Sequence, residues 1–286
     1  MKTLTLLLLV VPTLAIAADR SSFYFSLSDL STHTAVHFFV TDPLERQTGR
    51  LVTGTLVEQI PDSSYGIEGV DPEESGFGGE TSTFHMRPTA AGTYTVTVLG
   101  EATTSYLLTL LAENQAGQHV DAATLDIRGF IVAGSTRQYQ LQFDPTSNAS
   151  IRATKTVSFP SLRQDLQTAF QLGQIGDAKF VAKLNKILAK GEKALTKKGG
   201  KDRENKKEAV EKLRQFIQKL EKAFKGEKDD THDEDDDKDH DNEHGEKDRE
   251  KSAKRFVSEL AFKSLKGDAE TLIVTLGGKP GKRDDE

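Results

Sequence analysis

Residues 229–250 carry the side chains whose types most directly suggest chemistry, because carboxylates and imidazoles are interspersed there over a short distance. Carboxylate oxygens suit calcium or magnesium, whereas imidazole nitrogens suit zinc, nickel or copper. The segment therefore predicts a divalent-metal site. Its calcium affinity is expected to be weak, on the order of 10⁻⁴ to 10⁻³ M, because the chain has to become ordered on binding. The candidate ligands are His232, Asp235, Asp237, Asp239, His240, Asp241 and His244.

Two other interpretations of this acidic segment stay open. It has 13 Asp or Glu against three Lys or Arg, a net charge of -10, and no aliphatic or aromatic residue. Such a composition favours a disordered, solvated insertion, expected over 227–250. Residues 177–228 carry a net charge of +9. The acidic segment could therefore screen these basic residues from anionic partners.

Two further charge patterns are candidate binding sites. The glycine-rich segment 66–80 gathers carboxylates that could hold a loop calcium ion, with a flexible polar loop as the alternative. Lysines recur every three to four residues after residue 178, which places them on one helix face. That face is a candidate site for an anionic surface polymer, and an ordinary solvated face is the alternative. The calcium candidates are Glu68, Asp71, Glu73 and Glu74, and the anion-binding candidates are Lys179, Lys183, Lys186 and Lys190.

The sequence predicts no catalytic residue. It has no cysteine, which excludes thiol nucleophiles, thiolate zinc sites and iron–sulfur clusters. The signature motifs of zinc proteases, serine hydrolases and phosphate-binding loops are also missing. No cofactor is expected to be required, beyond a weakly bound calcium or transition metal.

The first 18 residues predict a cleaved signal peptide. Lys2 precedes an apolar run that Pro12 interrupts, and the small residues Ala15 and Ala17 form a cleavage site. The run is too short to span a membrane, and no second apolar run of spanning length follows. The mature protein is therefore expected to be secreted, extracellular or at the cell surface.

Residues 19–157 are expected to form an antiparallel β-sandwich. Apolar and polar residues alternate most regularly in "TYTVTVLG" (93–100) and "RQYQLQFD" (137–144), which gives each strand one buried face. Gly, Pro and Asp clusters separate the strands. Six weaker strands are expected at 23–28, 34–40, 50–57, 81–87, 105–113 and 123–131.

The hydrophobic period changes to 3.6 residues after Pro160, which predicts a helical domain over 158–278 and a flexible tail over 279–286. A first helix is expected to begin at a Ser161–Gln164 capping box and end at Gly173. Asp177 is expected to cap a second helix. A third should cover about 203–224, and a final pair should break at Gly267 and Gly277. The fold class is thus α+β and multidomain: an antiparallel β-sandwich and then a small α-helical bundle, packed as two separate bodies.

Several segments resemble known modules. "VTDPLERQTG", "VEQIPDSSYGIEGVD", "PTAAGTYTVTVLGEATTSYLLTL" and "GFIVAGSTRQYQLQF" resemble an accessory β-sandwich of secreted bacterial enzymes and surface proteins, over about 36–143. Glu45 and Gln59 depart from that pattern. "LRQDLQTAFQLGQIGDAKFVAKLNKILAKGEKAL", "AVEKLRQFIQKLEKAF" and "SAKRFVSELAFKSLKGDAETLI" resemble the helical FIMAH module over about 162–276, with the acidic segment inserted. Both resemblances imply an accessory, non-catalytic role.

The function that these patterns favour is a secreted or cell-surface, non-enzymatic binding or adhesion protein. Its partner would be an extracellular polymer or protein rather than nucleic acid, because no aromatic residues interleave with the lysines as stacking platforms. The first alternative is a divalent-cation-binding protein that uses the acidic, histidine-bearing segment. The second is a small secreted hydrolase with a carboxylate pair set by geometry rather than spacing.

Overall fold

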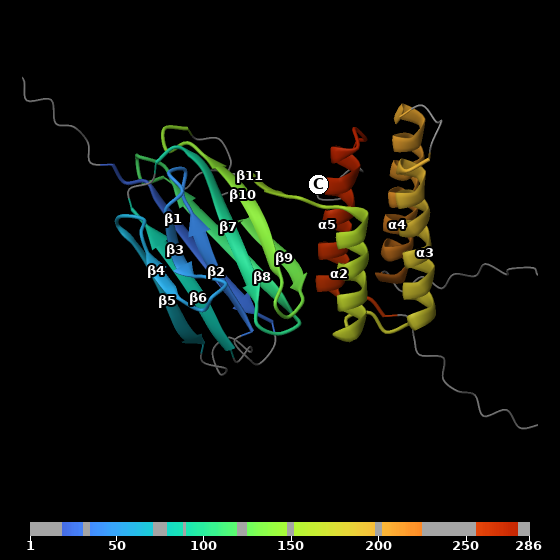
Figure 1. Cartoon of the computed structure of the whole chain (residues 1–286), viewed down its shortest axis with the longest axis horizontal. Coiled ribbons are helices and arrows are strands. Elements are labelled where there is room, and N and C mark those ends of the chain that lie inside the picture. The colour runs from blue at the N-terminus through green and yellow to red at the C-terminus, as the bar shows by residue number, and fades with distance from the viewer. Residues whose placement is uncertain are drawn as a thin grey trace, which may run out of the picture.

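The computed structural model describes residues 19–30, 35–70, 79–87, 90–118, 125–147, 152–197, 202–224 and 256–279. Strands make up the N-terminal part and helices the C-terminal part, as the change of hydrophobic period predicted. Figure 1 shows three layers in a row: the β-sandwich, an inner layer with α2 and α5, and an outer layer with α3 and α4.

The sandwich consists of two antiparallel sheets. One sheet has the strand order β5-β6-β1-β8-β9, and the other has the order β11-β10-β7-β2-β3-β4. Strands β9 and β11 are therefore edge strands, and both lie toward the helices (Figure 1). The strands are β1 (Ser22–Asp29), β2 (Val36–Thr41), β3 (Gln47–Arg50), β4 (Leu56–Glu58), β5 (Ser63–Val70), β6 (Gly79–Met86), β7 (Gly92–Gly100), β8 (Thr104–Glu113), β9 (Leu125–Ile131), β10 (Thr136–Phe143) and β11 (Arg152–Lys155).

Aromatic side chains fill the space between the sheets. The ring of Phe23 on β1 lies 4.9 Å from the ring of Tyr94 on β7 and 4.3 Å from the ring of Phe143 on β10, between ring centres. Because β1 belongs to one sheet and β7 and β10 to the other, these rings join the two inner faces. The alternation in β7 and β10 is confirmed, since their predicted inward residues are all buried.

Three strand predictions need correction. The segment 50–57, expected as one strand, holds a turn that separates β3 from β4, where Gly54 adopts a φ of 82°. Val52 and Leu56 are consequently exposed. Strand β5 was partly assigned to a loop, and the short strand β11 was not predicted.

The described helices are α2 (Phe159–Gln171), α3 (Ala178–Leu195), α4 (Asp202–Phe224) and α5 (Glu259–Thr275). Helix α2 starts one turn earlier than predicted, because the capping box joins Ser158 and Ser161 instead of Ser161 and Gln164. The predicted stop at Gly173 and the cap at Asp177 are confirmed.

Helix α5 runs without interruption through Gly267, so the predicted break there is wrong. A single glycine inside a helix costs only about 1 kcal/mol relative to alanine. The buried side chains on both sides of it, including Leu265 and Leu272, hold the helix together. The predicted stop at Gly277, which has a φ of 82°, is confirmed.

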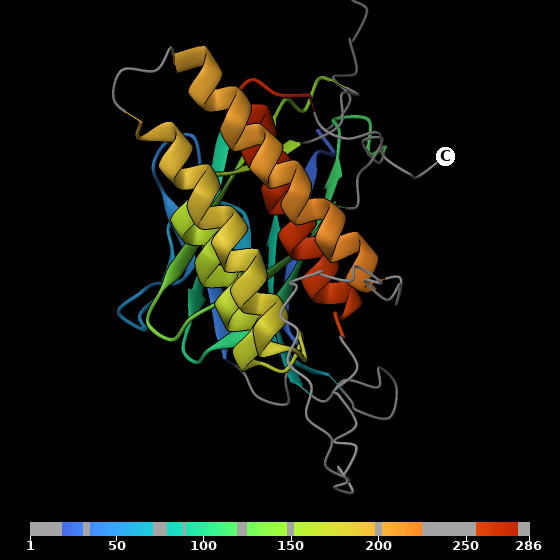
Figure 2. The same cartoon turned by 90° about the vertical axis from the view of Figure 1, so that its right-hand side faces the viewer.

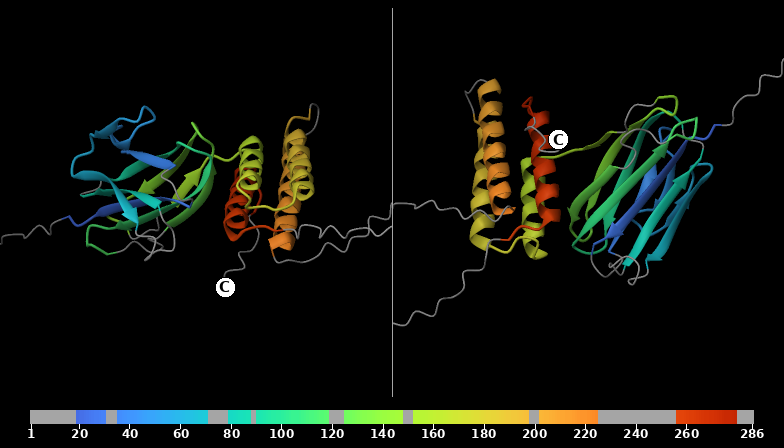
Figure 3. Two further views of the ribbon diagram at one scale, coloured as in Figure 1. Left: turned by 90° about the horizontal axis from the view of Figure 1, so that it is seen from below. Right: turned by 180° about the vertical axis from the view of Figure 1, so that it is seen from behind.

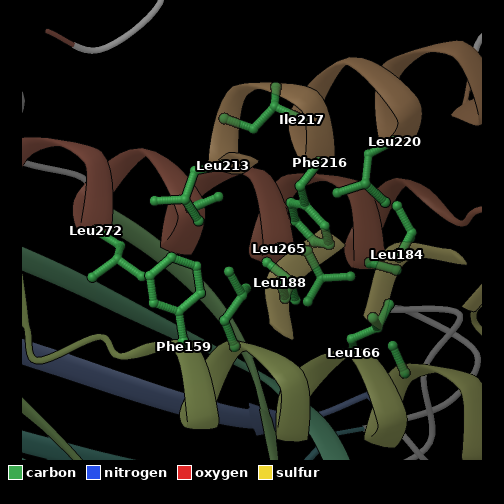
Figure 4. Packing of buried hydrophobic residues seen from close by; sticks show 14 of the residues in the cluster. Phe159, Leu166, Leu184, Leu188, Leu213, Phe216, Ile217, Leu220, Leu265 and Leu272 are labelled. Carbon is green, nitrogen blue, oxygen red and sulfur yellow. The ribbon is translucent and has the colours of Figure 1, made fainter. Parts of the chain in front are cut away.

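The four helices enclose one apolar core. Figure 4 shows side chains from all of them pointing toward one another, among them Leu166 of α2, Leu188 of α3, Phe216 of α4 and Leu265 of α5. Helices α3 and α4 lie side by side on the side away from the sandwich, as Figures 2 and 3 show. Their outer faces are therefore presented to solvent.

Two interior helical glycines should respond oppositely to the same substitution. A Cβ atom at Gly191 of α3 would lie 2.6 and 2.8 Å from ring carbons of Phe159, whereas a Cβ at Gly267 would meet no atom within 4 Å. We expect Gly191→Ala to lower the free energy of unfolding by about 1–2 kcal/mol, since overpacking exceeds the gain in helix propensity. Gly267→Ala should raise it by about 0.5–1 kcal/mol. Chemical denaturation of both variants tests the pair, and changes of the same sign would contradict the packing described.

Candidate functional site

The predicted metal ligands lie outside the part of the chain that the structure describes. His232, Asp235, Asp237, Asp239, His240, Asp241 and His244 all lie outside the described residues, as do Asp71, Glu73 and Glu74 of the predicted calcium loop. Glu68, the remaining calcium candidate, lies exposed on β5, where Thr83 Oγ1 donates to its Oε1 at 3.4 Å. In the part of the chain that the structure describes, no group of three or more His, Asp or Glu could hold a metal ion.

The structure places all four predicted anion-binding lysines on the exposed face of α3. Lys193, which the sequence analysis did not include, continues the same spacing and is also exposed. The one acidic residue of α3, Glu192, pairs with Arg163 of α2 at 3.2 Å. We call the face formed by Lys179, Lys183, Lys186, Lys190 and Lys193 the lysine stripe.

A basic groove of about 460 Å³ lies between the first half of α4 and the end of α5. Its single carboxylate, Asp202, pairs with Lys206 at 2.9 Å. Four cations line it: Arg203, Lys206, Lys207 and Arg214. The outer pair of helices thus carries two cationic features, the lysine stripe on α3 and this groove on α4.

The helices pack against one edge of the sandwich. Buried hydrophobic residues do fall into two clusters, but Phe130 of β9 belongs to the helical one. Strand β9 contacts both α2 and α5. The two inner helices therefore cover an edge strand that would otherwise be open to pairing with another chain.

A buried charge cluster joins the sandwich to the inner helices at this junction. Arg137 of β10 pairs with Asp165 of α2. Lys155 of β11 donates hydrogen bonds to both carboxylate oxygens of Asp268 on α5, at 2.8 and 3.0 Å, and its Nζ lies 3.7 Å from Asp165 Oδ2. The Asp165 side chain is 1% exposed. Because buried charges are tolerated only when they are paired, each carboxylate from the helices lies against a cation from the sandwich.

The environment of the charge cluster raises the pKa values of two of its groups, Asp165 and Lys155. Burial raises the pKa of Asp165 to about 7, against the opposing influence of Lys155 and Arg137, and the neighbouring Asp268 carboxylate adds to the rise. Burial disfavours charge on Lys155, but Asp268 and Asp165 outweigh it, so the pKa of Lys155 is raised. Lys155 stays an ammonium group at neutral pH, which excludes it as a nucleophile.

A hydrogen bond between two tyrosines lies beside the charge cluster. The hydroxyl oxygens of Tyr106 on β8 and Tyr139 on β10 are 2.5 Å apart and link the two sheets. Burial raises the pKa of both hydroxyl groups, so both stay protonated at neutral pH. This contact is structural, because neither tyrosine can supply a phenolate.

Asp165 should make stability depend on pH between about 4 and 7. Its pKa rises from 3.8 when unfolded to about 7 when folded. The folded chain therefore keeps a proton that the unfolded chain releases in this range, and stability falls as the pH rises. The quantity to follow is the unfolding free energy of the wild type minus that of Asp165→Asn. We expect this difference to fall by up to about 1.4 kcal/mol per pH unit across this range. Denaturant titrations at several pH values measure this difference, and a constant difference would contradict the assignment.

A Ser82–His37–Glu101 row has the composition of a hydrolase triad but not its hydrogen-bond directions. His37 Nε2 lies 3.0 Å from Arg50 Nη1, and a guanidinium only donates, so Nε2 accepts. Glu101 Oε1 lies 3.4 Å from the same Nε2, and Nδ1 lies 3.4 Å from Ser82 Oγ. Tyr65 donates to the same oxygen at 3.0 Å. The guanidinium of Arg50 therefore occupies the side of His37 that faces Glu101, and the hydroxyl of Tyr65 already donates to Ser82.

The sequence analysis missed the buried charge cluster, although a signal for it exists. Asp165 and Asp268 both occupy an apolar stripe, in the matching segments "LRQDLQTA" (162–169) and "LKGDAETL" (265–272). A carboxylate flanked by buried residues three before and four after must itself be buried and needs a cationic partner. The partners, Arg137 and Lys155, come from distant strands.

No helix within the described ranges is long and apolar enough to cross a membrane. The chain matches no protein-family model, and it has no significant match to a characterised protein or to a solved structure. The resemblances to the accessory sandwich and to the FIMAH module therefore stay predictions.

Proposed function

We propose that this chain is an exported, non-enzymatic binding protein that holds an anionic polysaccharide on the outer face of its helical layer. The observation that carries the proposal is the lysine stripe, which presents five exposed ammonium groups and no carboxylate on one face of α3. Between Lys179 and Lys193 the stripe extends about 21 Å at the helical rise of 1.5 Å per residue. Evenly spaced cations of this reach complement a polymer with repeated negative charges.

The basic groove supports a polymer over a small anion. It adds four cations on α4, the helix packed beside α3, so positive charge is spread over both outer helices. Among the aromatic residues of the two outer helices, Phe180 and Phe216 are buried, and the ring of the partly exposed Phe224 already stacks on the ring of Phe262, 4.4 Å away. Single-stranded nucleic acid is recognised largely by stacking on exposed aromatic rings, so a polysaccharide is the better fit.

A titration of the full chain with polygalacturonate tests the proposal. The matched control is the same polymer with its carboxylates fully methyl-esterified. We expect binding to the charged polymer that weakens as salt rises, because the contact is ionic and exposed. Equal binding to the neutral ester, or no binding to either polymer at low salt, would contradict it.

The chain's own acidic segment is the competing occupant of the lysine stripe, because its charge is also complementary. A variant in which a glycine–serine linker of equal length replaces residues 229–250 separates the two cases. The proposal expects the full chain and this variant both to bind polygalacturonate. Binding that appears only in the linker variant would mean that the acidic segment occupies the stripe, and would overturn the proposal.

A further inference from the structure

A pocket of about 600 Å³ lies between the sandwich and α5. Strands β9, β10 and β11 form one wall, and residues 263–275 of α5 form the other. Small-molecule sites typically have volumes of about 300–1,000 Å³ and often lie where two structural units meet. No residue of the lysine stripe lines this pocket, so the two features are separate.

Gly267 opens the pocket on its helical side. It lies in the interior of α5, where glycine weakens a helix relative to alanine. Packing does not require glycine there, since a Cβ atom would meet nothing within 4 Å, unlike at Gly191. A larger side chain at Gly267 would instead project into the open space that the pocket provides.

The pocket lining offers a donor and an acceptor side by side. Asp126 and Arg128 lie two residues apart on β9, so they share one face of the strand. The Arg128 side chain donates no hydrogen bond within the described part of the chain, and its positive charge acts on the nearby Glu259 carboxylate, whose pKa is lowered chiefly by Lys263 and also by Arg128. Asp126 uses Oδ1 to accept from Thr109, which leaves Oδ2 without a described partner.

The other two cations of the pocket lining are each paired with a carboxylate. Lys263 pairs with Glu259 at 2.5 Å, and Lys155 is bonded to Asp268. The buried Ser264 Oγ has no hydrogen-bond partner among the described residues. A buried polar atom without a partner is costly unless a ligand or water satisfies it. These groups therefore suit an uncharged ligand that both donates and accepts hydrogen bonds.

We propose that this pocket binds one sugar residue. Adjacent hydroxyl groups of a pyranose ring donate and accept at once, so they can accept from Arg128 and donate to Asp126. Its apolar C–H face packs against Ala153 and the half-exposed Val274. A cationic ligand would be repelled by Arg128, and an anionic ligand would be repelled by Asp126. The inference stands independently of the proposed function, because it uses none of the stripe lysines.

Saturation-transfer NMR of the full chain with glucose, galactose, mannose and N-acetylglucosamine tests this site, with glycerol as the control polyol. We expect at least one sugar to bind with a dissociation constant on the order of millimolar, as befits so small a ligand. Gly267→Leu fills the pocket and should abolish binding, whereas Gly267→Ala should retain it. Arg128→Gln loses a hydrogen bond and should weaken binding about tenfold.

Two controls keep the outcomes distinct. Arg163→Gln removes an exposed arginine elsewhere on α2 and should leave sugar binding unchanged. A variant with the stripe lysines replaced by glutamine should also keep sugar binding, even if polymer binding is lost. The proposal is overturned if none of the four sugars binds better than glycerol, or if binding survives both Gly267→Leu and Arg128→Gln.

Discussion

Replacing Lys155 with methionine is expected to lower the free energy of unfolding by about 3–5 kcal/mol at pH 8. Lys155 is 11% exposed and holds Asp268 directly, with Asp165 3.7 Å away. Without the ammonium group, two neighbouring carboxylates remain buried with Arg137 as their cation. The loss should be smaller at pH 5, because Asp165 already tends toward its neutral form there. Urea denaturation at the two pH values measures both effects.

A double-mutant cycle separates pairing from packing at Lys155. The double variant Lys155→Met, Asp268→Asn removes both partners, so we expect it to recover about 2–3 kcal/mol of the loss. Lys197→Met is the exposed control, because Lys197 pairs with Glu208 at 2.5 Å in solvent and should have little effect. If Lys155→Met were no more damaging than Lys197→Met, the charge cluster would not hold the junction.

Replacing the five lysines of the stripe with glutamine is expected to weaken polygalacturonate binding at least about a hundredfold at low salt. Each exposed cation that contacts a linear polyanion releases counterions, so the slope of log affinity against log salt should fall by about 3–4. Glutamine has nearly the helix propensity of lysine, and all five side chains are exposed. The fold should therefore be retained, which circular dichroism checks.

The five-arginine version of the stripe is the matched control for charge. Arginine keeps the positive charge at each position, so affinity and salt slope should stay near those of the wild type. A loss of binding in both versions would show that the lysines act through something other than charge. Unchanged binding in the glutamine version would remove the stripe from the proposed contact.

The alternation of apolar and polar residues was enough to predict the strands that have one buried and one exposed face. Tyr94, Val96 and Val98 on β7 alternate with threonines, and the structure buries them as expected. Strand β5 was missed because "SSYGIEGV" is polar and contains two glycines, and its place is fixed by pairing with β6. The turn at Gly54 was missed because apolar residues lie on both sides of it, as they would in a continuous strand.

The sequence was enough to predict the lysine stripe but not the junction between the sandwich and the inner helices. The stripe depends only on helical spacing, so its residues were predicted, and Lys193 follows from the same period. The junction depends on contacts over long sequence separations, such as Lys155 with Asp268, which local pattern cannot supply. The predicted break at Gly267 relied on the low helix propensity of glycine. Tertiary packing outweighs this local preference, so α5 continues through Gly267.

The most direct test of the account compares two variants with the same net charge. Lys186→Gln, Lys190→Gln removes two cations from the stripe, and Arg20→Gln, Arg87→Gln removes two exposed cations from the sandwich. Isothermal titration with polygalacturonate at low salt should show affinity lowered about tenfold or more in the stripe variant and nearly unchanged in the sandwich variant. Equal losses in the two variants would mean that net charge alone attracts the polymer, and that α3 holds no binding site.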